Sequence, residues 1–365
     1  MTTIRAAVMS APHAPIELRE IEAPTLGQGE ALLRTMYSEV CGTDVHLHEG
    51  RLSGVPYPII PGHVSVGHIE SLRGRITDID GVPFREGDLV TFLDVHETCG
   101  HCYECLVTKQ TTRCAHRKVY GITYGVNDGP LGGWAEQIWM KSGVHMLRIP
   151  NGVDPIRFIA GGCGLVTALH AIERAGLRLG MSVAVLGVGP VGQAALALAA
   201  LSGAHPVIGI GDPPSRRDFA ERMGATHTLG LDMPHADRVA AARALNGGRG
   251  VDVVIEAAGV PDAVPQALDL VRDGGRVVVV GQYTDAGATT INPHLQLNRK
   301  HAEVLGCWGC DYSHFHRALQ VLSAHGKALP WEEGITARFT LDRANEALAA
   351  VASRAVVKAL ITPNG

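Results

Sequence analysis

Four cysteines of the 365-residue chain lie close together, in the pattern Cys99-x2-Cys102-x2-Cys105-x8-Cys114. Thiolate sulfur is a preferred ligand of Zn²⁺, and four thiolates can surround one tetrahedral ion and leave no position open. A closed site of this kind stabilises a fold and has no room for substrate on the metal. Free thiols or disulfides are the alternatives, although a disulfide framework is unusual in an intracellular chain of this size. The cluster predicts a structural zinc site in a lobe at about residues 96–116.

A second motif with chemical meaning is rich in glycine. The apolar run 183–186 leads directly into Gly187-Val188-Gly189-Pro190-Val191-Gly192, and an alanine-rich helix is expected at 194–201. In such a loop the first glycine permits a tight turn, the second lets the backbone approach a pyrophosphate, and the third allows close packing of helix on strand. Free amides at the helix N-terminus then bind phosphate. Because a strand precedes the motif and a helix follows it, we predict a dinucleotide-binding loop, against the alternative of a glycine-rich turn in an α/β core.

The residues after the next strand bear on which dinucleotide binds. NAD sites place Asp or Glu at the end of that strand, where its carboxylate binds the ribose 2′-hydroxyl. This chain has Gly211 there, followed by Asp212. The glycine leaves room for a 2′-phosphate that Arg216 and Arg217 could pair with, whereas Asp212 would repel that phosphate and the arginines could equally form a solvated helix face. We expect NAD, with NADP as the alternative.

The pattern of predicted secondary structure around these motifs changes near Pro155. Before it, short β-rich runs separated by Gly and Pro predict a small antiparallel barrel or sandwich. After it, apolar strands alternate with helices, which is typical of a doubly wound parallel sheet. We expect the last fifty or so residues to return to the first domain. The predicted elements are strands at 6–9, 30–34, 67–72, 88–92, 183–186, 207–210, 251–255, 276–280 and 356–360, and helices at 194–201, 217–223, 313–324 and 343–351.

The bulk composition limits the class of protein. Hydrophobic residues make up 46% and charged residues 19%, and the net charge of −4 is spread without long blocks of one sign. These values give no reason to expect nucleic acid or a membrane as partner. The N-terminus lacks the apolar core of a signal peptide, and the most apolar stretch, 183–210, is interrupted by glycine and proline. We expect a cytoplasmic protein of two domains.

The motifs resemble those of the zinc-containing medium-chain alcohol dehydrogenases, in the same order and over essentially the whole chain. Besides the lobe and the glycine loop, three segments carry the resemblance: Cys-Gly-Thr-Asp-x-x-His from Cys41, Pro-Gly-His ending at His63, and Cys-Gly at Cys163. Spacing alone does not join these segments, because a single Cys or His is more often a core residue. The resemblance implies that Cys41, His63 and Cys163 bind a second, catalytic zinc ion and leave one position for water or substrate.

The resemblance also implies a fold and an assembly. It predicts an α/β protein with a GroES-like β-barrel catalytic domain, residues 1–155 and 312–365, and a Rossmann dinucleotide-binding domain, residues 156–311. Members of the family form oligomers through the edge strand of the cofactor domain. We therefore expect a homodimer or homotetramer.

Further residue roles follow from the same resemblance. Thr43 would hydrogen-bond the substrate oxygen and pass its proton, by way of the cofactor ribose, to His46, because the ordinary pKa of histidine lies close to neutral pH. Asp44 would orient the ligand His63, and Thr167 would lie against the nicotinamide.

Three positions depart from the family pattern. Val64 follows the ligand histidine where the family usually has Glu, which removes a carboxylate from close to the metal and predicts a more positive field there. Eight residues, instead of seven, separate the last two cysteines of the lobe, with Thr108 where a glycine is expected. Gly211 is the third. A further pair, Cys307 and Cys310, has redox-motif spacing but no helix start to activate a thiol, so we expect buried core.

These features predict an oxidoreductase that transfers a hydride between an alcohol, or an aldehyde or ketone in reverse, and a nicotinamide cofactor, with two zinc ions per chain. A polyol or amino-alcohol dehydrogenase of the same superfamily is the first alternative, but polyol members commonly have Glu in place of Cys163 and several lack the lobe. Reductases of C=C bonds mostly lack the zinc ligands. A non-catalytic scaffold protein is the alternative from another class, and the intact Thr43 and His46 argue against it.

Overall fold

The computed structural model describes residues 2–365, which divide into two compact units. The first unit contains the chain up to Cys163 together with Asp311–Ala324 and Ile335–Gly365. The second unit contains Gly164–Cys310 and His325–Gly334. Relative to the boundaries expected from the sequence, residues 156–163 and 311 lie with the first unit and residues 325–334 with the second.

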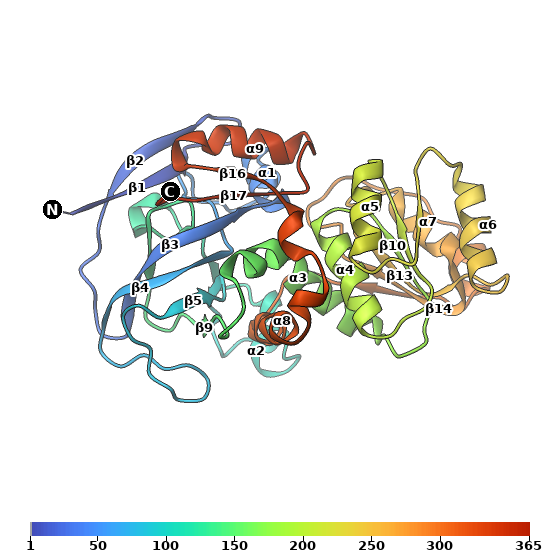
Figure 1. The fold of residues 1–365 in the computed structure, drawn as a ribbon, viewed down its shortest axis with the longest axis horizontal. Coiled ribbons are helices and arrows are strands. Elements are labelled where there is room, and N and C mark those ends of the chain that lie inside the picture. The colour runs from blue at the N-terminus through green and yellow to red at the C-terminus, as the bar shows by residue number, and fades with distance from the viewer. Residues whose placement is uncertain (1) are drawn as a thin grey trace. The chain divides into compact units, whose positions relative to one another are not determined.

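The second unit is built on a six-stranded sheet in which every pairing is parallel (Figure 1). The strand order is β12-β11-β10-β13-β14-β15, so the chain moves outward from β10 first to one edge and then to the other. This is the order of a doubly wound dinucleotide-binding fold, and it confirms the predicted fold class. The strands are β10 (Val183–Leu186), β11 (Val207–Ile210), β12 (His227–Leu229), β13 (Val251–Glu256), β14 (Val271–Val279) and β15 (Glu303–Gly306).

Helices cover this sheet, which explains why its central strands are continuous apolar runs. All four residues of β10 and all four of β11 are buried. Helices α4 and α5 pack on β10, β11 and β12, and α7 packs on β13 and β14. Helix α4 begins at Pro190, earlier than predicted, because proline fits the first turn of a helix. The helices are α4 (Pro190–Leu201), α5 (Pro214–Arg222), α6 (His235–Leu245) and α7 (Ala263–Leu270).

The first unit is mainly antiparallel. Its largest sheet has the strand order β16-β17-β3-β4-β5-β9, with β8 also paired to β3, and only the β16–β17 pair in it is parallel. Strand pairs β1–β2 and β6–β7 form two small sheets. The C-terminal strand β17 pairs with β3, so the end of the chain lies beside the strand that leads to Cys41. The strands are β1 (Thr3–Met9), β2 (Ile16–Glu22), β3 (Glu30–Val40), β4 (Ser65–Arg73), β5 (Leu89–Phe92), β6 (Val95–Glu97), β7 (Lys118–Val119), β8 (Gln137–Met140), β9 (Met146–Arg148), β16 (Ile335–Phe339) and β17 (Lys358–Ile361).

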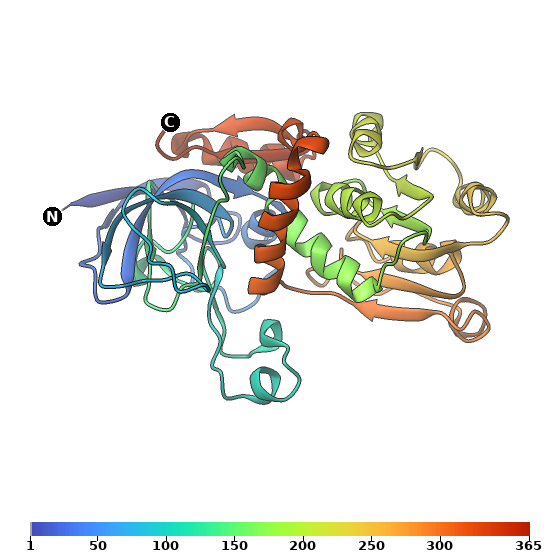
Figure 2. The same ribbon diagram turned by 60° about the horizontal axis from the view of Figure 1, so that its bottom comes forward.

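Short helices connect these strands. Figure 2 shows that the segment containing α2 and the 3₁₀ turn Thr111–Arg113 stands away from the sheets of the first unit as a separate lobe. The lobe makes no strand of the main sheet, so it needs a stabilising contribution of its own. The helices of this unit are α1 (Gly42–His48), α2 (Tyr103–Leu106), α8 (Tyr312–His325) and α9 (Ala344–Ala352).

Helix α3 (Pro155–Ala175) carries the chain from the first unit into the second. Gly162 interrupts it with φ 47° and ψ −142°, so α3 is two helical segments that meet at this residue. Among residues 2–365, α3 alone is long and apolar enough to cross a membrane by length and composition. Its most apolar window is 67% buried inside the protein, as is common for a core helix.

Candidate metal centre and cofactor loop

Helix α1 presents the first candidate metal ligand at its N-terminus. Cys41 is the N-cap residue, and its sulfur accepts a hydrogen bond of 3.3 Å from the backbone N–H of Thr43. Leu47 of the same helix is buried in a hydrophobic cluster with Ile59 and Trp134, which anchors α1 on the core. A helix N-terminus favours negative charge, so this position suits a thiolate.

Three residues far apart in the sequence meet at this helix end. The ligand atoms of Cys41, His63 and Cys163 all lie within 4.8 Å of one another. The Cys41 Sγ to His63 Nε2 distance is 3.6 Å. A tetrahedral zinc ion with Zn–S of about 2.3 Å and Zn–N of about 2.05 Å separates two such ligand atoms by about 3.6 Å. The three side chains therefore have the donor types and the spacing of an open zinc site.

The charges within this trio favour a positive ion at its centre. Hydrogen bonding from Cys163, followed by the charge of His63, holds the pKa of the Cys41 thiol well below its ordinary value. Burial alone would lower the pKa of His63, but the Cys41 thiolate raises it well above its ordinary value. The sulfur atoms thus stabilise positive charge beside them. The Nδ1 atom of His63 is buried and has no hydrogen-bond partner among the described residues.

Asp44 ties together the backbone that carries two of these ligands. Its carboxylate accepts hydrogen bonds from the N–H of Cys41 at 2.9 Å and from the N–H of Gly62 at 3.4 Å. Asp44 is fully buried, and burial raises the pKa of its carboxyl to about 8. The sequence predicted that Asp44 orients His63. The structure shows hydrogen bonds to the backbone on either side of the site, and an electrostatic interaction with His63.

Thr43 and His46, the residues of the predicted proton relay, lie on α1 three positions apart. That spacing places both side chains on one face of the helix. Thr43 is 8% exposed and His46 is half-buried. Burial, reinforced by the charge of Arg51, lowers the pKa of His46. A histidine in this state is neutral at pH 7 and can accept a proton.

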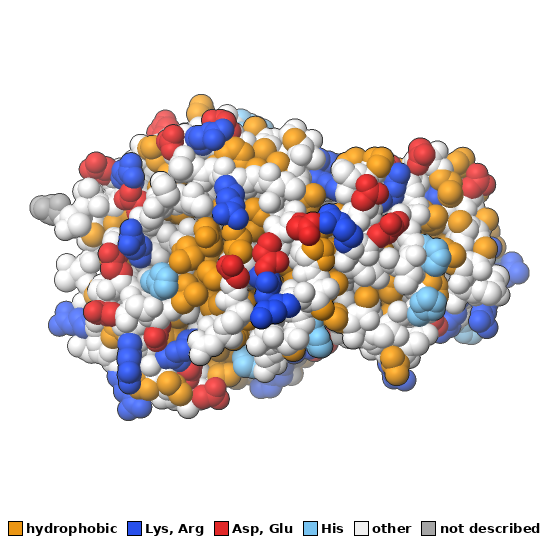
Figure 3. All heavy atoms as spheres, in the orientation of Figure 1, with side chains coloured by type: hydrophobic (Ala, Val, Ile, Leu, Met, Phe, Trp, Pro, Cys, Tyr) orange, Lys and Arg blue, Asp and Glu red, His pale blue; other side chains and the backbone are white. Residues whose placement is uncertain are grey.

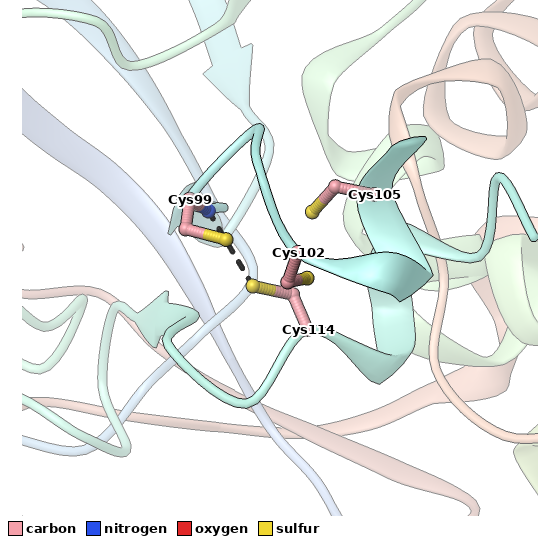
Figure 4. Close-up of side chains that lie close together, drawn as sticks. All are labelled: Cys99, Cys102, Cys105 and Cys114. Carbon is pink, nitrogen blue, oxygen red and sulfur yellow. Dashed lines mark hydrogen bonds between the residues drawn. The ribbon is translucent and has the colours of Figure 1, made fainter. Parts of the chain in front are cut away.

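The four cysteines of the lobe form a second cluster (Figure 4). Their sulfur atoms lie within 4.8 Å of one another and point toward a common centre. The N–H of Cys99 donates to Cys114 Sγ at 3.4 Å, and this hydrogen bond is the first cause that lowers the pKa of Cys114 to about 6. The extra residue between the last two cysteines is absorbed after α2, where Lys109 adopts φ 56° and the 3₁₀ turn then leads to Cys114. All four predicted cysteines are therefore brought together.

The glycine loop has the three features expected of a pyrophosphate-binding turn. Gly187 has φ 98°, and a Cβ there would lie 2.7 Å from the backbone after β13, so the turn requires glycine. Gly189, the N-cap of α4, has no atom within 4 Å of a Cβ position, which leaves open space beside the helix N-terminus. A Cβ on Gly192 would overlap the carbonyl oxygen of Gly187. Pro190 and Val191 begin α4. The loop thus fits a dinucleotide phosphate at the open face of Gly189.

Residues at the end of β11 contact the glycine loop and one another. A Cβ on Gly211 would lie 2.8 Å from Val188, so this glycine is required by packing on the glycine loop. Asp212 pairs with the Arg217 guanidinium, and its other oxygen accepts from the N–H of Leu231 at 2.9 Å. Arg216 is half-buried, and its carbonyl accepts a hydrogen bond from Gln193.

Comparison with known proteins supports the same assignment. A family model described as "Alcohol dehydrogenase GroES-like domain" matches residues 27–151, and one described as "Zinc-binding dehydrogenase" matches residues 190–324. The chain is 34% identical to 5-exo-hydroxycamphor dehydrogenase of Pseudomonas putida, over 99% of both chains. The chain belongs to the zinc-dependent medium-chain dehydrogenase family. This dehydrogenase has the predicted combination of a GroES-like domain and a Rossmann domain, and it is a nicotinamide-linked oxidoreductase that acts on a small molecule.

Solved structures agree with this placement. An alcohol dehydrogenase of Thermotoga maritima aligns with a TM-score of 0.95 at 30% identity and covers 100% of both chains. A protein described as a zinc-binding dehydrogenase of Sinorhizobium meliloti, bound to NADP, aligns with a TM-score of 0.87 at 27% identity, again over 100% of both chains. The family model and the NADP-bound neighbour therefore support zinc and a nicotinamide dinucleotide as the cofactors of this dehydrogenase.

Two residues of the metal centre were not found from the sequence. Glu39 and Lys358 form a buried ion pair at 2.7 Å, and Glu39 accepts a hydrogen bond from the N–H of Cys163. Val64 removes the carboxylate that the family usually has after the histidine, and the Glu39 carboxylate of β3 instead contacts the backbone of Cys163 while paired with Lys358. Glu39 is separated from its partner by more than three hundred residues, so no local motif signals the pair.

The remaining cysteines and Thr167 lie in the second unit. Cys307 is buried, and burial raises the pKa of its thiol to about 12, so it is no reactive thiolate. The Cys310 sulfur lies 3.6 Å from the hydroxyl of Thr167, and neither thiol is in a disulfide. The expectation of buried core is confirmed for Cys307, whereas Cys310 is only half-buried.

Proposed function

We propose that this dehydrogenase oxidises a secondary alcohol to a ketone with NAD⁺, using one zinc ion at Cys41, His63 and Cys163 and a second in the four-cysteine lobe. The observation that carries the proposal is the geometry of the three-residue site, where a sulfur and a nitrogen are separated by the edge length of a zinc tetrahedron. Three ligands leave a fourth position open, whereas the lobe offers four thiols and leaves none.

Zinc in the three-residue site supplies a Lewis acid for the substrate oxygen, and the nicotinamide supplies the hydride acceptor. Thr43, at the first turn of α1, accepts a hydrogen bond from the substrate hydroxyl and orients it. His46, kept neutral by its lowered pKa, accepts the proton that the substrate hydroxyl releases and passes it to solvent. Asp44 holds the backbone of both ligand segments while this occurs.

The preference for a secondary alcohol rests on the relative named for 5-exo-hydroxycamphor, whose reacting hydroxyl lies on a ring carbon. A polyol or amino-alcohol substrate is the alternative within the family. Both also carry secondary hydroxyls, so the distinction lies in the polar groups around the reacting carbon.

The preference for NAD⁺ rests on Asp212 and Arg217. The carboxylate of Asp212 is partly exposed at the end of β11, where it would repel a 2′-phosphate. Arg217 is already engaged by Asp212 and by the carbonyl oxygen of Gly211 at 3.2 Å, so its charge is not free to hold that phosphate. Thr167 is assigned to the nicotinamide end of the cofactor.

We further infer that the chain is an oligomer that pairs through β15. This strand is one edge of the parallel sheet, and three of its four residues are exposed, including Val304 at 43%. Unpaired edges of this kind invite pairing with a second chain. Light scattering that gives the monomer mass of 38.6 kDa contradicts this assembly.

The experiment that tests the function combines elemental analysis with absorbance near 340 nm. The purified protein should hold two zinc ions per chain and reduce NAD⁺ faster than NADP⁺ with a panel of primary, secondary, cyclic and polyhydroxy alcohols. Cys163→Ser should abolish turnover and leave NADH binding intact, since its thiol is assigned only to the metal. A fully active variant refutes the ligand assignment, and NADH binding without any turnover favours the scaffold alternative.

A further inference from the structure

A fully enclosed ion pair lies beside the three-residue metal site. The Lys358 Nζ atom is 2.7 Å from Glu39 Oε1, and the two side chains are 3% and 1% exposed. They come from the adjacent strands β17 and β3, whose register pairs Ala359 with Val40. Buried charges are expensive unless each finds hydrogen-bond partners as well as its counter-ion. The partners of both groups belong to the segment that carries Cys163.

The pair satisfies the two helix ends created by the break in α3. Lys358 donates to the carbonyl oxygens of Ile159 at 3.2 Å and of Gly161 at 3.1 Å, where the first helical segment ends. Glu39 Oε2 accepts from the N–H of Cys163 at 2.7 Å, where the second segment begins. Helix C-termini favour cations and helix N-termini favour anions, so each charge lies at the end that prefers it.

The side chains of Glu39 and Lys358 pack directly against the helix break at Gly162. A Cβ on Gly162 would overlap Glu39 Oε2 and lie 2.7 Å from Lys358 Nζ. The two side chains therefore occupy the volume that any other residue at this position would fill. Their contact with the broken helix is a packed arrangement as well as an electrostatic one.

Glu39 also contacts the other two ligand segments. It lies near the end of β3, two residues before Cys41, and its N–H donates to the carbonyl of Val64, next to His63, at 3.0 Å. One residue thus links the backbone segments of all three ligands. The Glu39 carboxylate contacts the backbone of Cys163, whereas the residue after the ligand histidine, Val64, carries no carboxylate.

We propose that Glu39 and Lys358 are the positioning pair of the metal centre, which fixes the Cys163 sulfur at bonding distance from the metal by holding the helix break at Gly162. The inference rests on the proposed metal site. The pair itself touches neither metal nor substrate, and it acts through the backbone of Cys163.

The test compares Glu39→Gln, Lys358→Met and the double variant for metal affinity and metal geometry. Zinc release to a chromophoric chelator gives the affinity of each site, and Co²⁺ in place of Zn²⁺ gives thiolate charge-transfer and d–d absorption that report coordination geometry. The four-cysteine lobe is the internal control in the same molecule. Asp252→Asn, which breaks the ion pair with Arg272 in the second unit, is the matched control for lost stability alone.

We expect each single variant to lose about 10–100-fold in affinity at the three-residue site, the usual effect of removing a group that orients a ligand. The Co²⁺ spectrum of that site should change while the lobe keeps its metal. A single variant leaves one buried charge unpaired and can unfold. The double variant removes both charges, so it separates a loss of metal positioning from a loss of stability. It should recover the melting temperature and remain at least about tenfold weaker in metal affinity.

Wild-type metal affinity and an unchanged Co²⁺ spectrum in the double variant would overturn the inference, because the pair would then serve folding alone. Equal metal loss in Asp252→Asn would overturn it too. A wild-type protein that holds metal only in the lobe overturns the proposed function itself, so the two failures are distinguishable.

Discussion

Replacement of Gly162 by alanine should destabilise the first unit far more than replacement of most exposed glycines. The residue has φ 47° and ψ −142°, a region that non-glycine residues enter at a cost of about 1–3 kcal/mol. The added methyl also overlaps Glu39 and approaches Lys358, and overpacking of this kind costs about 1–3 kcal/mol. The sum, about 2–6 kcal/mol, is a large part of the 5–15 kcal/mol that usually separates folded from unfolded protein.

Gly152 provides the matched control in the same unit. It also has a positive φ, of 85°, but a Cβ there meets no atom within 4 Å. Gly152→Ala should therefore show only the backbone cost, about 1–2 kcal/mol. Urea denaturation followed by tryptophan emission gives both values, because Trp134 is fully buried in this unit. If the two variants shift the midpoint equally, the packed contact between Gly162 and the ion pair contributes nothing and the reasoning is refuted.

Three further predictions concern the proton relay, the cofactor and the lobe. His46→Gln should lower kcat/KM for alcohol oxidation by roughly 10²-fold near neutral pH. We expect the wild-type rate to fall as pH drops through the lowered pKa of His46, because protonated His46 cannot accept a proton, and His46→Gln should remove that fall; an unchanged acid limb contradicts the role. Asp212→Ala should raise the ratio of NADP⁺ to NAD⁺ efficiency by about tenfold, since one charge repulsion is removed and Arg217 is released; no shift contradicts the cofactor assignment. Cys102→Ser should reduce the zinc content from two ions per chain to one and make the lobe susceptible to proteolysis. A lobe that resists proteolysis with one metal per chain would show that its fold does not depend on zinc.

Local motifs in the sequence predicted the parts of the site that are local in structure. The four cysteines of the lobe come together because a short loop can bring such close positions to one centre. The glycine loop is equally local, and the separate demands on Gly187, Gly189 and Gly192 are visible in its geometry. The position of Cys41 at a helix N-cap follows from the residues directly after it.

Other features depend on long-range packing that no window of sequence contains. Cys163 lies on α3 and meets Cys41 and His63 only in the folded chain, so the sequence could join them by resemblance alone. The break in α3 could not be predicted either. A glycine at position 162 does not by itself indicate a φ of 47°, or that Glu39 and Lys358 occupy the space where a Cβ would be. Strand β15 was missed because its exposed residues lack the apolar pattern of the inner strands.

The pair of Glu39 and Lys358 places two opposite charges beside a metal centre that has Val64, and no carboxylate, directly after its histidine. With Val64 uncharged, an isolated buried Lys358 would be strongly unfavourable, and removal of one partner from such a pair typically costs about 3–5 kcal/mol. Glu39 neutralises that lysine from the neighbouring strand and at the same time accepts from the N–H of Cys163. The net charge contributed by the pair is zero, so the pair does not replace the carboxylate missing at position 64, and the more positive field expected there stays a prediction. A substitution at Glu39 should consequently be tolerated only together with one at Lys358, since either charge left alone is buried without a counter-ion.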